Sequence, residues 1–534
     1  MKLSVLLLLV APPLIYGAIF FGLSPSINND VGVGLSVLQS MRGGAPFNVL
    51  VHPDSADIAK DASTFVAAWS PSQYLLPALF QFPGFDLGQS ITVVVALCVC
   101  LGIIGWYLLY RTMGFSKCES LLSCLLIEAF RHFLAPFDDY NGGEVILFGA
   151  APWSGLLIWR SMAAGAAGSF IATLAALTLA TFAKLSGLIF VSALLAGAAF
   201  YQGRAYMRGA ATWTDRTRAI RSFARAMMPM ALAWLVFAAI FRVFWLSRGM
   251  TAIDPAGPAP FSALNFYFPF VATVLSAFGF GDALGFLRSF PPPWGKPFDN
   301  EMVIYALTLP FCAVALSFVA WRLRASLDGT VGFVLATCAA YVACLVVLYS
   351  IGANLVFGER FFRPASLLLL PCLVSAQLAI SVRPLRYLAW SFTLSLACFG
   401  IAGSIWHIAG TDRRPVGTLG FRHPVASSEL VAYLQTTFGT VSDRRNGRVV
   451  YVPSPDIALE IRDARVIATT AYYEPVAWLK SRKYFGRVEE LVIVMPTIFL
   501  AQGRADAILQ SFKDYAPDRW ARRQIDSRFI EFRQ

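Results

Sequence analysis

A single acidic side chain stands just after the first apolar stretch of the chain. Asp30 follows two asparagines and precedes a helix-like stretch that ends at Arg42, where Gly43 and Gly44 begin a turn. A carboxylate at this point can act as a general base or bind a metal ion. The alternative is structural, because Asp also caps helix N-termini by accepting a hydrogen bond from a free backbone amide. The spacing leaves both interpretations open.

A second acidic site consists of two adjacent aspartates in a short polar segment. Asp138 and Asp139 lie between Pro136 and Gly142, with an apolar run on each side. Paired carboxylates opposite Asp30 could bind a divalent metal ion through oxygen ligands, and this is the one cofactor that the sequence suggests. A solvated turn rich in Asp and Gly is the alternative. The sequence does not decide which aspartate would act.

The composition identifies the chain as a polytopic membrane protein. Of its 534 residues, 57% are hydrophobic and 14% are charged, whereas soluble domains carry about 25% charged residues. A helical crossing of a bilayer needs roughly 20 apolar residues, and runs of that length recur along the sequence. A soluble enzyme, a secreted disulfide-rich protein and a disordered chain are therefore excluded. Much of the net charge of +12 lies in arginine-rich loops, which indicates cytoplasmic loops rather than nucleic-acid binding.

The apolar runs predict an all-α bundle of about 11 transmembrane helices. They cover about 1–23, 89–110, 119–135, 143–160, 162–182, 187–203, 227–246, 301–321, 329–350, 365–382 and 387–408. Basic residues in short loops predict the orientation. With Lys2 in the cytoplasm, the arginine cluster 204–225 is cytoplasmic, and the long first loop 24–88 lies outside. The loop 247–300 is also outside, and we expect an irregular segment packed on the outer surface or a lid.

Two further features concern the soluble parts. In the first loop, Asp54, Asp57 and Asp61 would share one face if 54–64 were helical, and a solvated face is the expectation there. The chain is expected to divide into a membrane domain, 1–408, and a small soluble α/β domain, 409–534. In the second domain we expect a helix that starts near Ser427 and ends at Gly439, strands at 448–452 and 490–495, and a helix at 505–515.

Four segments, in order along the chain, resemble motifs of the GT-C superfamily, membrane glycosyltransferases that use lipid-phosphate-linked sugars and include protein mannosyltransferases and aminoarabinose transferases. Asp30, the helix after it and the turn Gly44–Phe47 are similar to the family's acidic residue, amphipathic helix and Gly-x-Pro-aromatic turn. Trp69–Pro77, Ala183–Gly187 and Glu359–Pro364 are similar to its Tyr-Pro-Pro-x-x-x-Leu, Lys-Tyr-Ser/Thr-Gly and Glu-Arg-Tyr-x-x-Pro segments. The resemblance covers about 1–408. The family often has a paired Asp-Glu where this chain has Asn-Asp, so only one carboxylate carries over.

The resemblance implies an inverting transfer of a sugar from a polyprenyl-phosphate donor to a lipid, glycan or protein acceptor. In this interpretation Asp30 deprotonates the acceptor hydroxyl, and Asp138 or Asp139 helps to position the acceptor or a metal. The donor phosphate would be bound by Lys184, Arg360 and Arg363, with Glu359 beside them. For the basic residues, snorkelling to the membrane surface is the alternative. The expected location is a bacterial inner membrane, with the active site facing the periplasm.

A transporter or flippase of a lipid-linked glycan is the alternative function. Such a protein would carry ionisable residues deep inside several spans, where they are costly and mark a pathway. Here the predicted spans are nearly free of charge, and Glu128 is the main exception. The segment 409–534 shows no catalytic constellation, and it could bind the acceptor, cover the mouth of the site or dock a partner.

Overall fold

The computed structural model describes residues 3–81, 84–208, 212–249, 264–290, 300–323, 329–351, 358–411 and 414–534. These residues form two compact units. The helical unit contains 1–16, 95–136 and 143–409, and the mixed unit contains 17–94, 137–142 and 410–534. The last segment of the mixed unit begins at Gly410, close to the predicted boundary between residues 408 and 409. The division into these two domains stays a prediction. Lys2, on which the predicted orientation depends, lies outside the described residues.

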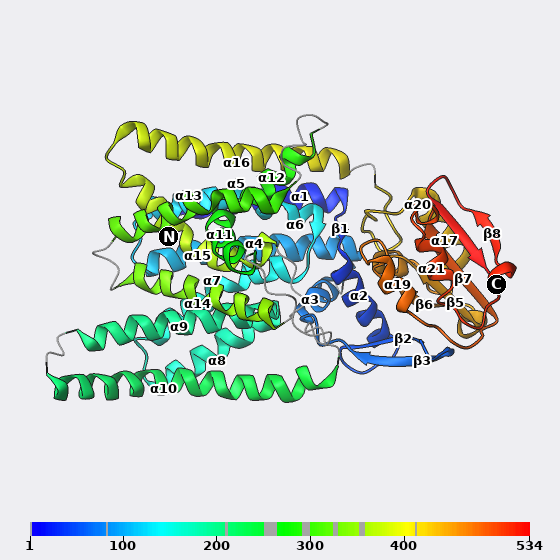
Figure 1. Ribbon diagram of the computed structural model, residues 1–534, viewed down its shortest axis with the longest axis horizontal. Coiled ribbons are helices and arrows are strands. Elements are labelled where there is room, and N and C mark those ends of the chain that lie inside the picture. The colour runs from blue at the N-terminus through cyan, green and yellow to red at the C-terminus, as the bar shows by residue number, and fades with distance from the viewer. Residues whose placement is uncertain are drawn as a thin grey trace. The chain divides into compact units, whose positions relative to one another are not determined.

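Long helices make up the helical unit (Figure 1), and four of them, α1, α4, α6 and α16, run past its sequence limits. They are α1 (Leu3–Leu23), α4 (Leu87–Thr112), α5 (Lys117–Ala129), α6 (Arg131–Asp138), α7 (Gly143–Ser161), α8 (Ala166–Ala183), α9 (Ser186–Met207), α10 (Trp213–Phe244), α11 (Leu264–Leu275), α12 (Phe280–Arg288), α13 (Glu301–Arg322), α14 (Thr330–Ser350), α15 (Arg363–Leu378) and α16 (Arg383–Thr411). By length and apolar composition, eight helices in the described ranges can cross a membrane, or ten if each of two bent pairs is one span. The chain is a multi-pass membrane protein, and the predicted helical bundle is confirmed. The predicted spans 143–160 and 365–382 form α7 and α15, which this count does not include.

One prediction about the bundle is wrong. The segment 247–300, expected to be an irregular loop, contains α11, the 3-10 turn η2 (Ser276–Phe278) and α12 in its described part. The two helical pieces meet at an angle of 85°. Gly279 separates them with a φ of 63°, in the left-handed region that glycine adopts without steric cost. The apolar pieces on either side of this break are too short to be recognised as a span from the sequence. The rest of the predicted loop lies outside the described residues.

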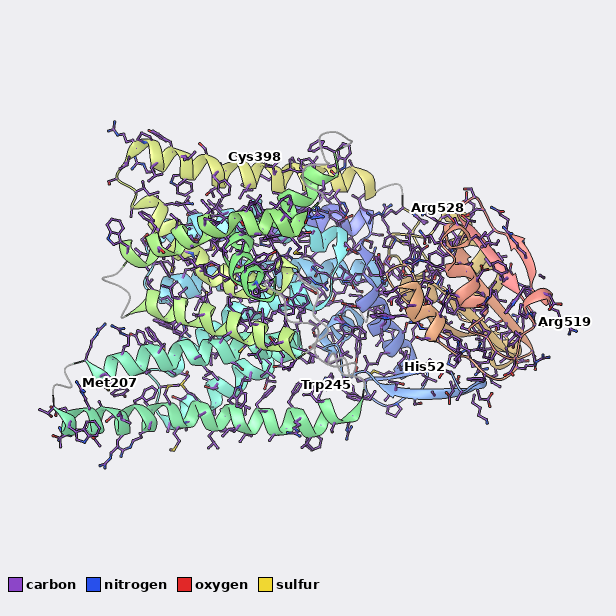
Figure 2. All side chains as sticks on the ribbon, in the orientation of Figure 1. His52, Met207, Trp245, Cys398, Arg519 and Arg528 are labelled. Atoms are coloured by element: carbon purple, nitrogen blue, oxygen red, sulfur yellow. The ribbon has the colours of Figure 1, made fainter. Side chains whose placement is uncertain are left out.

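Helix α9 packs closely against its neighbours in the bundle. Its first neighbour is α10. The two helices run side by side in opposite directions, so that Met207 at the end of α9 and Trp245 after α10 lie at opposite ends of the pair (Figure 2). Against α14, the helix α9 presents Gly197, where a Cβ atom would lie 2.1 Å from the Thr337 hydroxyl. A small residue is needed there because it lets the two helix backbones approach.

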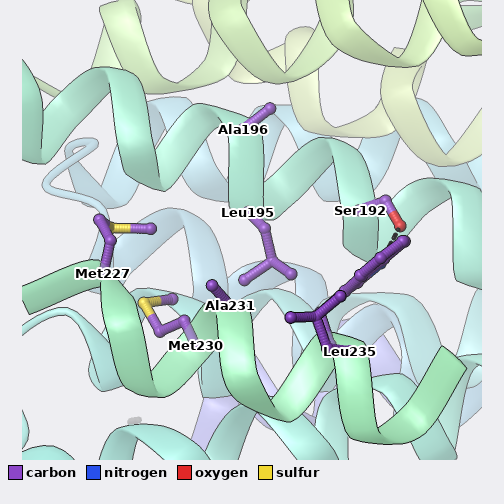
Figure 3. Close-up of a pocket in the computed structure, with 8 residues that line it drawn as sticks. Ser192, Leu195, Ala196, Met227, Met230, Ala231 and Leu235 are labelled. Atoms are coloured by element: carbon purple, nitrogen blue, oxygen red, sulfur yellow. Dashed lines mark hydrogen bonds between the residues drawn. The ribbon is translucent and has the colours of Figure 1, made fainter. Parts of the chain in front are cut away.

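A groove of about 420 Å³ lies between α9 and α10. Leu195 of α9 and Met227 and Met230 of α10 line it (Figure 3), and so does Trp234, which donates a 2.9 Å hydrogen bond to Ser192. Its lining is almost entirely apolar, as expected for a surface that faces lipid tails.

The mixed unit combines the first loop with the C-terminal segment. The first loop forms β1 (Ser26–Ile27), α2 (Asn29–Arg42), the hairpin β2 (Val49–Asp54) and β3 (Asp57–Phe65), and α3 (Ser72–Phe80), while β4 (Asp139–Tyr140) pairs with β1. The helical face expected for Asp54, Asp57 and Asp61 is therefore wrong. The segment 57–65 pairs with 49–54 as an antiparallel strand, and the tight reversal at 54–57 makes a hairpin.

A five-stranded sheet in the order β6-β5-β7-β9-β8 forms the core of the C-terminal segment. Its elements are α17 (Ser428–Phe438), β5 (Arg448–Val452), α18 (Pro455–Ala458), β6 (Arg465–Ala468), α19 (Val476–Ser481), β7 (Glu490–Pro496), α20 (Ile498–Ala501), α21 (Arg504–Leu509), β8 (Ala521–Gln524) and β9 (Phe529–Arg533). Val449 and Tyr451 enter one core and Val450 and Val452 the other, because successive side chains of a strand point to opposite faces.

The α/β domain and its two predicted strands are thus confirmed. The helix cap is confirmed as well, because the Ser427 side chain accepts from the Leu430 amide and Gly439 ends α17. The helix expected at 505–515 is shorter, since α21 ends at Leu509.

A buried histidine of the mixed unit lies between two carboxylates. His423 is fully buried, and its ring nitrogens lie 3.0 Å from Asp456 and 3.1 Å from Glu460. Burial opposes the protonated ring, but the hydrogen bonds to the two carboxylates outweigh it and raise the pKa of His423 to about 9. The ring is therefore a buried cation between two anions.

We predict that the triad of His423, Asp456 and Glu460 makes the mixed unit less stable at alkaline pH. The contribution of a histidine with a raised pKa is complete below about 6.5, its ordinary value, and is lost as the pH rises through about 9, at a scale of about 3 kcal/mol. This contribution is measured by hydrogen exchange of the β5 backbone amides in the full chain, with the rates corrected for intrinsic exchange at each pH. His423→Gln should lower protection near pH 7 and remove its pH dependence, whereas His52→Gln should not. A wild-type profile that is flat from pH 6 to 10 would contradict the assignment.

Candidate functional site

Asp30 lies in the first turn of α2. The N-cap of this helix is Asn28, whose side chain accepts a 2.9 Å hydrogen bond from the Val31 amide. The capping interpretation of Asp30 is therefore wrong. Its side chain is partly exposed, and the positive end of the helix dipole favours an ionised carboxylate there. The position thus suits a base that must accept a proton from a ligand.

The second acidic site is built onto the same segment. β4 runs parallel to β1 with Ser26 opposite Asp139, and the Ser26 hydroxyl lies 3.1 Å from an Asp139 carboxylate oxygen. Asp138 is only 3% exposed, so the solvated-turn interpretation is wrong for this residue. Gln73 of α3 joins the two acidic segments. Its side-chain amide donates to the backbone carbonyl of Asp30 at 3.3 Å, and its backbone carbonyl accepts from the Tyr140 hydroxyl at 2.9 Å.

Within the mixed unit, the structure thus brings the segments of Asp30 and of Asp138 and Asp139 together. A metal site is a separate matter. Among the described residues, no group of three or more His, Cys, Asp or Glu side chains is arranged to hold a metal ion.

In the helical unit, one carboxylate gathers two of the predicted phosphate ligands. Glu144, in the first turn of α7, lies 2.6 Å from the Lys184 ammonium and 3.6 Å from the Arg360 guanidinium. Both cations also lie 5.0 Å from the ring centre of Phe361. Lys184 is 20% exposed and rests against an anion, which differs from a side chain that extends to the membrane surface. Two cations against one anion leave a net positive charge.

Arg363 belongs to a different set of contacts. It lies 3.6 Å from Asp282 of α12, which also lies 3.6 Å from the His132 ring. The two arginines, three residues apart in the chain, therefore face different carboxylates. Within the described part of the chain, Nε of Arg363 is buried and has no hydrogen-bond acceptor.

Glu359 does not pair with either arginine. It lies in the 3-10 turn η5 (Glu359–Phe361), and its carboxylate accepts a 2.7 Å hydrogen bond from the Tyr305 hydroxyl. Burial raises the pKa of Glu359 to about 7, although the bond from Tyr305 acts in the opposite direction. Glu359 therefore holds the turn that carries Arg360 and Phe361, and its role beside the donor phosphate stays a prediction.

Three residues of these clusters were not predicted from the sequence. The sequence does contain a signal for Glu144, because this acidic residue directly follows the Gly142-Gly143 pair and stands at the start of an apolar run. Asp282 lay in a segment expected to be a loop. Tyr305 carries no signal, since one tyrosine in an apolar run looks like core packing.

Comparisons with known proteins give matches in structure. No family model matches the chain, and no curated protein matches its sequence. Two crystal structures of ArnT from Cupriavidus metallidurans, one bound to undecaprenyl phosphate and one in the apo state, match at a TM-score of 0.52 and 12% identity. The alignment with the first covers 100% of this chain and 98% of that one. The chain adopts an ArnT-like GT-C fold.

A further match is to part of a larger protein. The mycobacterial arabinofuranosyltransferase AftD, as the mutant R1389S, aligns with 90% of this chain and 36% of its own length, at a TM-score of 0.41 and 14% identity. The predicted resemblance is confirmed at the level of the fold by the likeness to ArnT.

We predict that Glu359→Gln stabilises the protein at pH 8. The raised pKa means that the folded state keeps a proton that the unfolded chain gives up above about 4.5, so stability falls as the pH rises through about 7. The amide removes this penalty and still accepts from Tyr305, and the gain should reach up to about 3 kcal/mol. Thermal unfolding in detergent at pH 8 and pH 5 measures it.

The gain should be much smaller at pH 5, where the penalty has hardly begun. Glu301→Gln is the control, because its carboxylate pairs with Arg288 and its loss should not stabilise the protein. An equal effect of Glu359→Gln at both pH values would contradict the account.

Proposed function

We propose that this chain is an integral membrane glycosyltransferase. It would move a sugar from a polyprenyl-phosphate donor to a hydroxyl group of a lipid, glycan or protein acceptor on the non-cytoplasmic side of a bacterial inner membrane. The observation that carries the proposal is the pair of cations, Lys184 and Arg360, that Glu144 and Phe361 hold together. The likeness in fold to ArnT, one structure of which holds undecaprenyl phosphate, supports the same class of donor.

The cation pair suits the leaving group of such a reaction. A polyprenyl phosphate leaves as an anion, and the negative charge on its oxygens grows as the bond to the sugar breaks. An arginine fork and a lysine point charge stabilise that growing charge by charge-assisted hydrogen bonds. Because Phe361 and Glu144 already orient both side chains, little reorganisation is needed during the reaction.

The proposed chemistry is a direct displacement. The oxygen of the acceptor hydroxyl forms a bond to the anomeric carbon, and the bond from that carbon to the phosphate oxygen breaks, with the electron pair leaving on the phosphate. The hydroxyl proton passes to the Asp30 carboxylate. One displacement inverts the anomeric centre. Asp138 and Asp139 are proposed to position the acceptor, and β1 and β4 hold their segment against that of Asp30.

We predict that Asp30→Asn lowers the rate of transfer by about 10²- to 10⁴-fold, the usual contribution of a general base. The amide keeps the size of the side chain but cannot take up the proton. The rate of transfer from a radiolabelled polyprenyl-phosphate sugar measures the effect. Asp54→Asn, on the hairpin of the same unit, is the matched control and should leave the rate unchanged. Full activity of a folded Asp30→Asn protein would refute the assignment.

We predict that Lys184→Gln and Arg360→Gln each weaken binding of undecaprenyl phosphate by about 10-fold or more, because each removes a charge-assisted contact. Titration of the purified protein with this lipid, followed by intrinsic tryptophan fluorescence, measures the affinity. Arg288→Gln, which breaks an ion pair with Glu301 elsewhere in the helical unit, is the control. If both cation variants bind as the wild type does, the phosphate lies elsewhere.

A further inference from the structure

A polar cavity lies entirely within the mixed unit. Its volume is about 770 Å³, within the range of roughly 300–1,000 Å³ that small-ligand sites occupy. The second half of α2, the hairpin β2–β3, the helix α18 and the strand β6 surround it. None of the acidic residues assigned to the reaction lines it, so it is distinct from the site described above.

The charge in this cavity is predominantly positive. Arg445, Arg465 and Arg482 line it, and Asp61 is the one carboxylate that does so. Arg465 is 8% exposed, and its Nη1 lies 3.1 Å from Asp61. Its Nε and Nη2 are buried and have no hydrogen-bond partner among the described residues, and the same holds for Nη1 of Arg482.

Buried guanidinium donors without acceptors are costly, because each has lost its water. A ligand that brings anionic oxygens supplies the missing acceptors, and a guanidinium fork fits a carboxylate or phosphate in two-point geometry. Arg482 is already paired with Glu474 through its other terminal nitrogen. The remaining N–H donors of Arg465 and Arg482 are thus enough to bind one anionic group.

The rest of the lining points to a sugar ring as the remainder of the ligand. Ser36 and Ser40 on α2 and Asn446 offer hydroxyl and amide groups, and Tyr484 offers an aromatic face. Tyr484 is held in place by stacking on Phe512 at 4.7 Å between ring centres. Hydroxyls and an aromatic face together suit a pyranose, which is polar at its edge and apolar on its face.

We propose that this cavity binds an anionic sugar, a glycan unit that carries a carboxylate or a phosphate, with Arg465 and Arg482 on the anion. As a subsite for the acceptor it rests on the proposed transferase function, and it narrows the acceptor to a negatively charged glycan. Binding itself needs no donor and no turnover. Failure of the transfer reaction and failure of this site are therefore separate results.

The test is a binding experiment on the purified full chain with two probes that differ only in the anion, glucuronate and glucose. Saturation-transfer NMR should give at least a 10-fold tighter affinity for glucuronate, the effect of one charge-assisted pair. Arg465→Gln should reduce that preference to near one. Arg482→Gln, in a half-buried side chain, gives the same test if the first variant does not fold. Arg519→Gln is the control, since Arg519 is exposed and far from the cavity residue His52 (Figure 2).

A second arm separates a soluble glycan from a glycolipid headgroup. Nanodiscs with glucuronosyl diacylglycerol are compared with nanodiscs that hold glucosyl diacylglycerol, with hydrogen exchange of β6 as the readout. Protection by the charged lipid alone assigns the site to a membrane glycolipid, and protection by soluble glucuronate as well assigns it to the sugar itself; both support the proposal. Equal affinity for the charged and neutral probes, no binding of any probe, or a preference that survives in both arginine variants would overturn it.

Discussion

The carboxylate of Glu144 holds two cations, Lys184 and Arg360, in a helical unit whose core is largely apolar. Removing an ion from water costs several kcal/mol unless an opposite charge and hydrogen bonds replace the water. That requirement forces three distant parts of the chain to meet: the start of α7, the turn between α8 and α9, and the turn before α15. With two cations and one anion, the cluster carries one unbalanced positive charge. The proposed donor phosphate would balance this charge.

The neighbouring contacts fix the same turn from the other side. The Tyr305 hydroxyl bonds to Glu359, and the Tyr341 hydroxyl bonds to the carbonyl of Phe361 at 2.5 Å. Arg363, two residues further on, is tied to Asp282 on the bent pair α11–α12. Each residue of this short segment therefore has a separate structural partner. Such anchoring keeps Arg360 in one orientation, which an electrostatic role in catalysis requires.

The sequence could predict features that depend on local signals, and it missed those that depend on tertiary contacts. Apolar runs predicted the bundle because a span must be apolar over its whole length, and Ser427 and Gly439 marked the ends of α17 by their capping chemistry. The break at Gly279 hid a helical pair, since each arm alone is too short to be distinctive. The sequence leaves a capping role open for Asp30, because Asp and Asn both cap helices, and only the structure gives that role to Asn28. The pairing of Lys184 with Glu144 joins residues 40 positions apart, which no spacing rule reveals.

The central claim is that the protein transfers a sugar and releases polyprenyl phosphate. The most direct measurement reconstitutes the wild-type protein in vesicles with a doubly labelled polyprenyl-phosphate sugar and an envelope extract as the source of acceptor, and follows both labels. The account predicts that one polyprenyl phosphate is released for each sugar that becomes attached to acceptor. Movement of the intact donor from one leaflet to the other, with no cleavage of the bond between sugar and phosphate, would contradict it and identify a flippase.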